Sequence, residues 1–277
     1  MTKIYNDTTS IIEYKIKIKN KCDGTQLNEY INRLPQHPYV LNPVSVIRDN
    51  KNMCLAYKVT SKGTTLRNYI LDKSSASHTG RLTARISGLF RHKKRLSPIQ
   101  IMMHLIDGYE FLLKNHMLTG QSNINPDSIW IEPDDNGNMI AFVINTVEFI
   151  TMNEYDLNTA YWSPEMLSRY NHVAFYDDTP ASFQSLSSKM KRTDTRPSTI
   201  SVVYSLGLVL HFIIVQRDPF EGTRVNVYDK PPLHFIHDER MKLNILKALD
   251  SDMRERPTLQ QYREYLLDAD ISSCVIL

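Results

Sequence analysis

The chain has 277 residues, of which 42% are hydrophobic and 23% are charged. This balance is typical of a globular protein with a buried core and excludes an intrinsically disordered chain. The net charge of +3 is too small to indicate nucleic-acid binding by the whole molecule, so any basic contact site must be local.

The spacing of the cysteines and the lengths of the apolar runs exclude further classes of protein. Cys22, Cys54 and Cys274 lie far apart without a CxxC pair, which argues against a disulfide framework or a zinc site and favours a reducing compartment. The N-terminus has no apolar run typical of a signal peptide. The longest apolar run, VVYSLGLVLHFIIV, has about 14 residues and predicts a buried helix, because a membrane-spanning helix needs about 20.

The first part of the chain is rich in predicted strands. Residues 14–19 (YKIKIK) alternate strictly, which indicates a strand. Residues 27–34 have helical spacing of apolar side chains and predict a short helix. The runs VLNPVSVI and MCLAYKV flank RDNKN, which predicts a β-hairpin.

The rest of the chain is predominantly helical. Ser-Pro followed by helically spaced apolar residues predicts a long helix over 96–116. Two short strands are expected around the DDNG turn that follows. Further helices are predicted over 200–215, near 239–250 and near 258–268, and two polar inserts cover 73–95 and 171–199. The sequence therefore predicts an α+β fold.

Five short motifs occur in the same order as in protein kinases. They are NPDSIWI, IAFVINTV, YWSPEML, VVYSLGLVLHFII and RERPTLQQY. They resemble, in turn, the end of the kinase catalytic loop, the strand before Asp-Phe-Gly, the Ala-Pro-Glu element, the buried helix that follows and the late Arg-Pro-Thr helix. The resemblance implies a two-lobed protein-kinase-like fold, with a truncated β-rich N-lobe over 1–62, a mainly helical C-lobe over 63–270 and a tail over 271–277.

The residues that a kinase needs for catalysis are replaced. The resemblance places Asn123 at the catalytic base, Ser128 at the metal-binding Asn and Asn145 at the Asp of Asp-Phe-Gly. A neutral amide is a poor general base, and Mg²⁺ favours carboxylate ligands. No glycine-rich loop precedes the first strand, because the first glycine is Gly24. We therefore expect no catalytic residue, no metal and no cofactor.

One structural pair of the family is retained. Glu165 and Arg256 match two residues that form a buried ion pair in kinases, and such partners are costly to separate. The resemblance offers Lys17 or Lys19 as the phosphate-holding lysine and Glu29 as its helix partner. Alternating lysines on an edge strand, however, favour a solvated face.

Two features suggest a membrane partner. The sequence ends in SSCVIL, which resembles a geranylgeranylation signal at Cys274. The insert over 73–95 contains a basic amphipathic stretch that fits an anionic membrane or an acidic partner, although a solvated loop has the same composition. The basic residues are Arg81, Arg85, Arg91, Lys93, Lys94 and Arg95.

The resemblance implies a pseudokinase. We expect a scaffold or allosteric module that binds a protein partner in the cytoplasm or on the cytoplasmic face of membranes, and we expect no nucleic acid. One alternative is a divergent kinase or nucleotide-dependent transferase that recruits Glu148 or Asp127. The other is a peptide-binding module derived from a kinase C-lobe.

Overall fold

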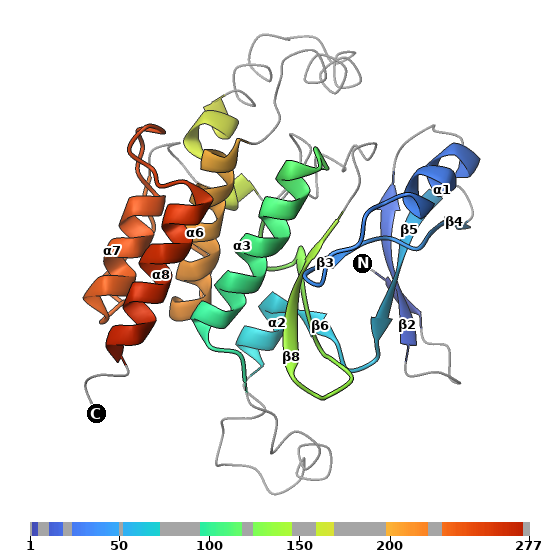
Figure 1. Ribbon diagram of the computed structural model, residues 1–277, viewed down its shortest axis with the longest axis horizontal. Helices are drawn as coiled ribbons and strands as arrows, with labels where there is room; N and C mark the ends of the chain where they lie inside the picture. The colour runs from blue at the N-terminus through green and yellow to red at the C-terminus, as the bar shows by residue number, and fades with distance from the viewer. Residues whose placement is uncertain are drawn as a thin grey trace, which may run out of the picture.

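The computed structural model describes residues 2–4, 11–18, 24–49, 52–72, 95–117, 124–145, 159–168, 198–220 and 229–273. These residues form an α+β fold with two four-stranded sheets. Figure 1 shows the first sheet on one side, the second sheet in the middle and a layer of long helices on the other side. The predicted fold class is thus confirmed at the α+β level.

The first sheet is antiparallel and has the strand order β1-β2-β5-β4. Its strands are β1 (Thr2–Ile4), β2 (Ile11–Ile18), β4 (Ser45–Asp49) and β5 (Asn52–Thr60). The helix α1 (Gly24–Asn32) packs beside β4 with Leu27 and Ile31 buried. The strand predicted over 14–19 is present as β2 up to Ile18, the short helix predicted over 27–34 is α1, and β4 and β5 pair as the predicted hairpin requires.

The run VLNPVSVI is not one strand, as its composition suggested. It divides into β3 (Val40–Leu41), which pairs in parallel with β8 of the second sheet, and β4, which pairs with β5 of the first. Pro43 between the two strands has no N–H group and cannot continue a hydrogen-bonded ladder. The run VLNPVSVI therefore contributes one strand to each sheet.

The second sheet has the order β3-β8-β7-β6. Besides β3 it contains β6 (Thr64–Thr65), β7 (Ile129–Pro133) and β8 (Met139–Ile144). The hairpin of β7 and β8 turns at Asp134–Asn138, where Gly137 has φ +82°, a backbone conformation that glycine adopts without strain. The short helix α2 (Leu66–Leu71) follows β6.

The helix α3 (Pro98–Lys114) covers the second sheet. It begins where the sequence predicted, because the Ser97 side chain accepts the Gln100 N–H and the Gln100 side chain accepts the Ser97 N–H. Gly108 lets α3 approach the sheet closely, since a Cβ there would lie 2.8 Å from the Tyr39 carbonyl oxygen.

The helix α6 (Thr199–Val215) lies at the centre of the helical layer. It is buried on nearly all sides over residues 201–213, as its uniformly apolar sequence predicted. It begins inside the insert expected over 171–199, since Ser198 is its N-cap. No helix in the described part of the chain is long and apolar enough to cross a lipid bilayer.

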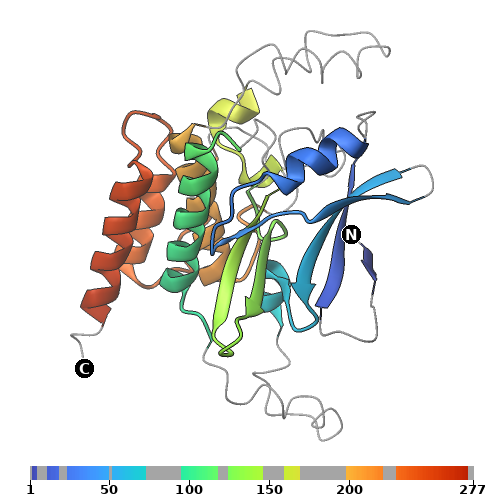
Figure 2. The same cartoon turned by 45° about the vertical axis from the view of Figure 1, so that its right-hand side comes forward.

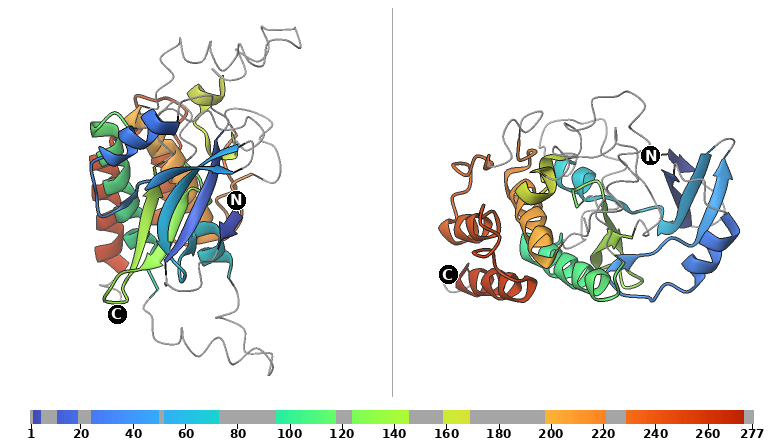
Figure 3. Two further views of the ribbon diagram at one scale, coloured as in Figure 1. Left: turned by 90° about the vertical axis from the view of Figure 1, so that its right-hand side faces the viewer. Right: turned by 90° about the horizontal axis from the view of Figure 1, so that it is seen from above.

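Two helices complete the layer, α7 (Glu239–Ala248) and α8 (Leu259–Ser273). Figures 2 and 3 show α6, α7 and α8 beside α3, on the side of the second sheet away from the first. Arg263 of α8 forms ion pairs with Asp107 and Glu110 of α3, which fixes the position of α8 along α3. One connected hydrophobic core runs through both sheets and these helices.

Candidate functional site

The loop before β7 is closed by hydrogen bonds between Asn125 and Ser128. The Asn125 Oδ1 accepts the N–H groups of Asp127 (2.7 Å) and Ser128 (3.2 Å), as in an Asx turn. The Ser128 hydroxyl donates to the Asn125 carbonyl (2.8 Å) and accepts the Asn125 N–H (3.0 Å). Ser128, one of the positions compared with a metal ligand, is therefore engaged in holding this loop together.

Asn145 lies at the end of β8, where it joins the two sheets. Its side-chain amide donates to the Asn42 Oδ1 at 2.7 Å, and its backbone N–H donates to the Leu41 carbonyl at 3.0 Å. Its own carbonyl accepts the Tyr57 hydroxyl at 2.8 Å. Asn145 is 2% exposed and Asn42 is 8% exposed. The second position compared with a metal ligand thus lies inside a buried hydrogen-bond network.

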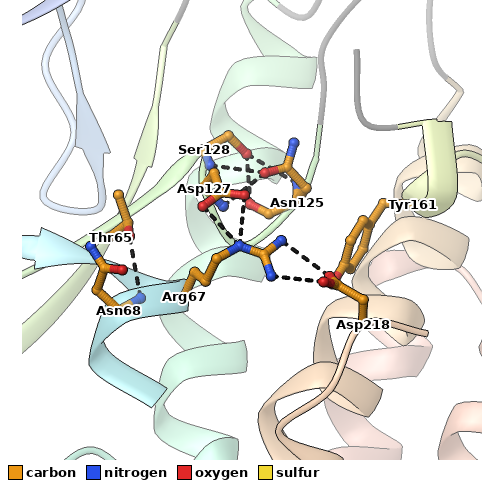
Figure 4. Close-up of polar contacts among 8 residues, drawn as sticks. All are labelled: Thr65, Arg67, Asn68, Asn125, Asp127, Ser128, Tyr161 and Asp218. Carbon is orange, nitrogen blue, oxygen red and sulfur yellow. Dashed lines mark hydrogen bonds and ion pairs between the residues drawn. The ribbon is translucent and has the colours of Figure 1, made fainter. Parts of the chain in front are cut away.

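An ionic cluster centred on Arg67 connects α2 with the Asn125–Ser128 loop and the segment after α6. Figure 4 shows the Arg67 guanidinium between two carboxylates. Its Nε–H donates to both Asp127 oxygens (2.9 and 2.8 Å), and its two terminal nitrogens donate to Asp218 at 3.0 and 3.1 Å. The Tyr161 hydroxyl also donates to Asp218, at 2.8 Å.

The protonation states of the cluster follow from its contacts. Burial lowers the pKa of Arg67, but its hydrogen bonds to Asp218 and Asp127 outweigh this effect and raise the net pKa above its usual value. Burial raises the pKa of Tyr161, and the charge of Asp218 raises it further. Arg67 is therefore charged and Tyr161 is protonated at neutral pH, as this hydrogen-bond pattern requires.

The contribution of this cluster to stability is expected to be modest. The Asp127 and Asp218 side chains are 42% and 45% exposed, so solvent screens their charges. A double-mutant cycle of Arg67→Ala and Asp218→Asn, measured by urea unfolding, should give a coupling of about 1 kcal/mol that decreases with added salt.

The exposed Arg240 of α7 provides the control for that cycle. Arg240→Ala should change the free energy of unfolding by less than about 0.5 kcal/mol. A coupling between Arg67 and Asp218 that is zero at low salt, or independent of salt, would contradict the ionic account of the cluster.

Residues 60–63 link the two sheets. The N–H groups of Thr60 and Gly63 both donate hydrogen bonds within the protein. The Thr60 N–H donates to the Glu132 Oε2 at 2.7 Å, and the same oxygen accepts the Trp130 Nε1–H at 2.9 Å. The Gly63 N–H donates to the Thr60 carbonyl at 3.0 Å. Gly63 lies so close to the Trp130 ring that a Cβ would collide with it.

The ion pair expected between Glu165 and Arg256 is present. The two Arg256 terminal nitrogens donate to the two Glu165 oxygens at 2.8 and 3.0 Å. The Arg256 side chain is fully buried and that of Glu165 is 18% exposed. Burial alone would raise the pKa of Glu165, but the hydrogen bonds and the charge of Arg256 lower it below its usual value. The pair ties the short helix over 164–168 to the segment before α8.

Several predicted site residues lie outside the described residues. They are Asn123, Glu148, Cys274, Lys19 and, of the basic stretch, Arg81, Arg85, Arg91, Lys93 and Lys94. Arg95 is described and exposed; its guanidinium stacks over the Tyr69 ring at 5.4 Å. Of the positions compared with catalytic residues, only Ser128 and Asn145 can be placed.

The predicted site residues did not include Arg67, Asp218, Asn42 and Tyr57. Arg67 stands 151 residues from Asp218 along the chain, and Tyr57 stands 88 residues from Asn145. No local sequence pattern predicts contacts between residues so far apart in the chain. A signal for this network was Asn42 inside the largely apolar run VLNPVSVI, because a polar residue that is buried there needs a partner.

Comparison of the sequence with models of known protein families finds no match, and a search of curated proteins finds none either. In the described part of the chain, no three His, Cys, Asp or Glu side chains gather as a metal site would require.

Proposed function

We propose that this chain is a catalytically inactive protein-kinase-like module that acts as a scaffold or allosteric protein-binding domain. The order of the elements supports this proposal. A small antiparallel sheet with one helix, α1, precedes a linker and a larger part in which the hairpin of β7 and β8 and the buried helix α6 follow α3. The buried pair of Glu165 and Arg256 supports the same assignment.

The state of Asn145 is the observation that carries the proposal. An Asp at this position would bind the metal in a kinase. The neutral amide here donates to Asn42 inside the protein and is 2% exposed. Ser128, at the other metal-binding position, is bound within its loop. Both side chains have a structural role, and neither position carries a carboxylate.

The contacts of Asp127 give less support to the alternative hypothesis, an active transferase that uses this residue. Both Asp127 oxygens accept the Arg67 Nε–H, so the carboxylate is already paired with a cation. A carboxylate that acts as a general base must lie about 2.6–3.2 Å from the atom whose proton it removes. Glu148, the other carboxylate considered, lies outside the described residues.

A peptide-binding module derived from a C-lobe alone is also less favoured. Residues before 62 form the sheet of β1, β2, β5 and β4. Leu27 and Ile31 of α1, and Leu34 just after it, belong to the common core. A vestigial small lobe would have little reason to retain this packing. The kinase resemblance compares Glu29 of α1 with the partner of a phosphate-holding lysine. The Glu29 side chain is exposed.

A phosphate-transfer assay tests the proposal. We expect the purified full chain, incubated with labelled ATP and Mg²⁺ or Mn²⁺, to transfer no phosphate to itself or to a generic substrate protein. The proposal is wrong if labelled product accumulates and disappears in Asp127→Asn or Glu148→Ala, because that loss would assign the activity to this chain and not to a contaminant.

A further inference from the structure

Two hydrogen bonds, here called the junction, attach β5 of the first sheet to the second sheet. At the end of β5, the Thr60 N–H donates to the Glu132 Oε2 of β7 at 2.7 Å. Earlier in β5, the Tyr57 hydroxyl donates to the carbonyl of Asn145, which follows β8, at 2.8 Å. Residues of a strand rise by about 3.3 Å each, so the two bonds are about 10 Å apart along β5. The sheets could turn about a single bond, whereas two separated bonds resist that rotation.

Glu132 also connects the junction with the linker over 60–63. Its Oε2 accepts the Trp130 Nε1–H at 2.9 Å as well as the Thr60 N–H. Gly63, at the other end of the linker, lies so close to the Trp130 ring that a Cβ would collide with it. The Gly63 N–H donates to the Thr60 carbonyl at 3.0 Å, which closes the linker as a turn. The linker is therefore held against β7 at both of its ends.

The Tyr57 bond of the junction is buried and its acceptor is held in place. Tyr57 is 0% exposed and Asn145 is 2% exposed, so water does not compete for this bond. Asn145 is itself bonded to the Leu41 carbonyl through its N–H and to Asn42 through its side chain. At Glu132 the acceptor is a carboxylate, to which hydrogen bonds are stronger than those between neutral groups. Both bonds of the junction are therefore costly to break.

We infer that the junction holds the two sheets in one orientation, and that the linker opens only when both bonds of the junction break. The closed form contains both bonds and the open form contains neither, so the loss of either bond makes the open form more populated. A protein partner that contacts both sheets therefore meets a surface that is already formed, which lowers the cost of binding. The inference is independent of the proposed function.

Trypsin cleavage after Lys62 tests this inference on the full chain. Lys62 is an exposed residue of the linker, but a protease cuts a folded chain only where it opens. Cleavage after Lys247 of α7 serves as the internal reference, because it reports opening of the helical layer. Mass spectrometry at early times gives both rates. Glu132→Ala should raise the rate after Lys62, relative to that after Lys247, by about tenfold or more.

Tyr57→Phe is the decisive variant, because Tyr57 lies outside the linker and its hydroxyl donates to Asn145. It should raise the relative rate after Lys62 by about three- to tenfold, since the junction opens as a unit. Glu132→Gln keeps an oxygen acceptor and should change this rate by less than about threefold. Thr60→Val keeps the N–H and removes a buried hydroxyl that has no partner among the described residues, so it should be cleaved like the wild type.

Three results would overturn the inference. The first is a Glu132→Ala variant whose relative rate after Lys62 equals that of the wild type. The second is a Tyr57→Phe variant with an unchanged rate, which would mean that the linker opens while the sheets stay in place. The third is an equal rise after Lys62 and Lys247, which would indicate global unfolding. If Glu132→Ala does not fold, Tyr57→Phe decides alone.

Discussion

Replacing Arg256 with alanine is expected to lower the free energy of unfolding by at least about 3 kcal/mol. The substitution leaves the Glu165 carboxylate, 18% exposed, without the guanidinium that lowers its pKa. It also removes the donor to the Asp250 carbonyl and the contact of the guanidinium with the Tyr204 ring, 4.8 Å away. Urea unfolding monitored by circular dichroism measures the change.

A double-mutant cycle separates the ion pair from these other contacts. Glu165→Ala should cost a similar amount to Arg256→Ala, and the double variant should cost clearly less than the sum, because neither charge is then left without its partner. Arg254→Ala, two residues earlier and 90% exposed, is the matched control and should cost less than about 0.5 kcal/mol. Additive effects of Glu165→Ala and Arg256→Ala would show that the pair does not interact.

Introducing a carboxylate at Asn145 should destabilise the protein and not activate it. Asn145→Asp places a negative charge at a position that is 2% exposed and faces the Asn42 Oδ1. We expect a loss of about 3 kcal/mol or more at pH 7.5, since an isolated buried charge is costly. Asn68→Asp, the same substitution at an exposed position of α2, should cost less than about 0.5 kcal/mol.

The pH dependence of Asn145→Asp has a defined sign. Burial should raise the folded-state pKa of this Asp above its unfolded value of about 3.9. The loss of stability relative to the wild type should therefore be small near pH 4 and grow as the pH rises. A variant as stable as the wild type at pH 7.5, or one that Mg²⁺ stabilises, would contradict the buried account of this position.

Local chemistry made much of the fold predictable. The Ser97-Pro98 start of α3 and the apolar sequence of α6 each specify an element through its own residues, by capping and by burial. The strand at β2 follows from alternation in the same way. The split of VLNPVSVI was not predicted, because apolar composition hid the effect of Pro43 on the ladder.

The site was less predictable because its contacts join distant parts of the chain. The proposal that Ser128 and Asn145 stand at metal-binding positions without a carboxylate needs only the sequence, since residue type decides whether a side chain suits Mg²⁺. What the replacing residues do instead depends on Asn42 and Tyr57. These contacts depend on how the two sheets meet.

Nucleotide binding is the most direct test of the central claim that this chain is a kinase-like fold without its chemistry. The melting temperature of the full chain should be measured with increasing ATP, with and without Mg²⁺. A ligand present at 100 times its Kd stabilises a protein by about 2.7 kcal/mol, which corresponds to several degrees for a chain of this size. The account predicts no shift in either condition. A rise of several degrees that requires Mg²⁺ would contradict it.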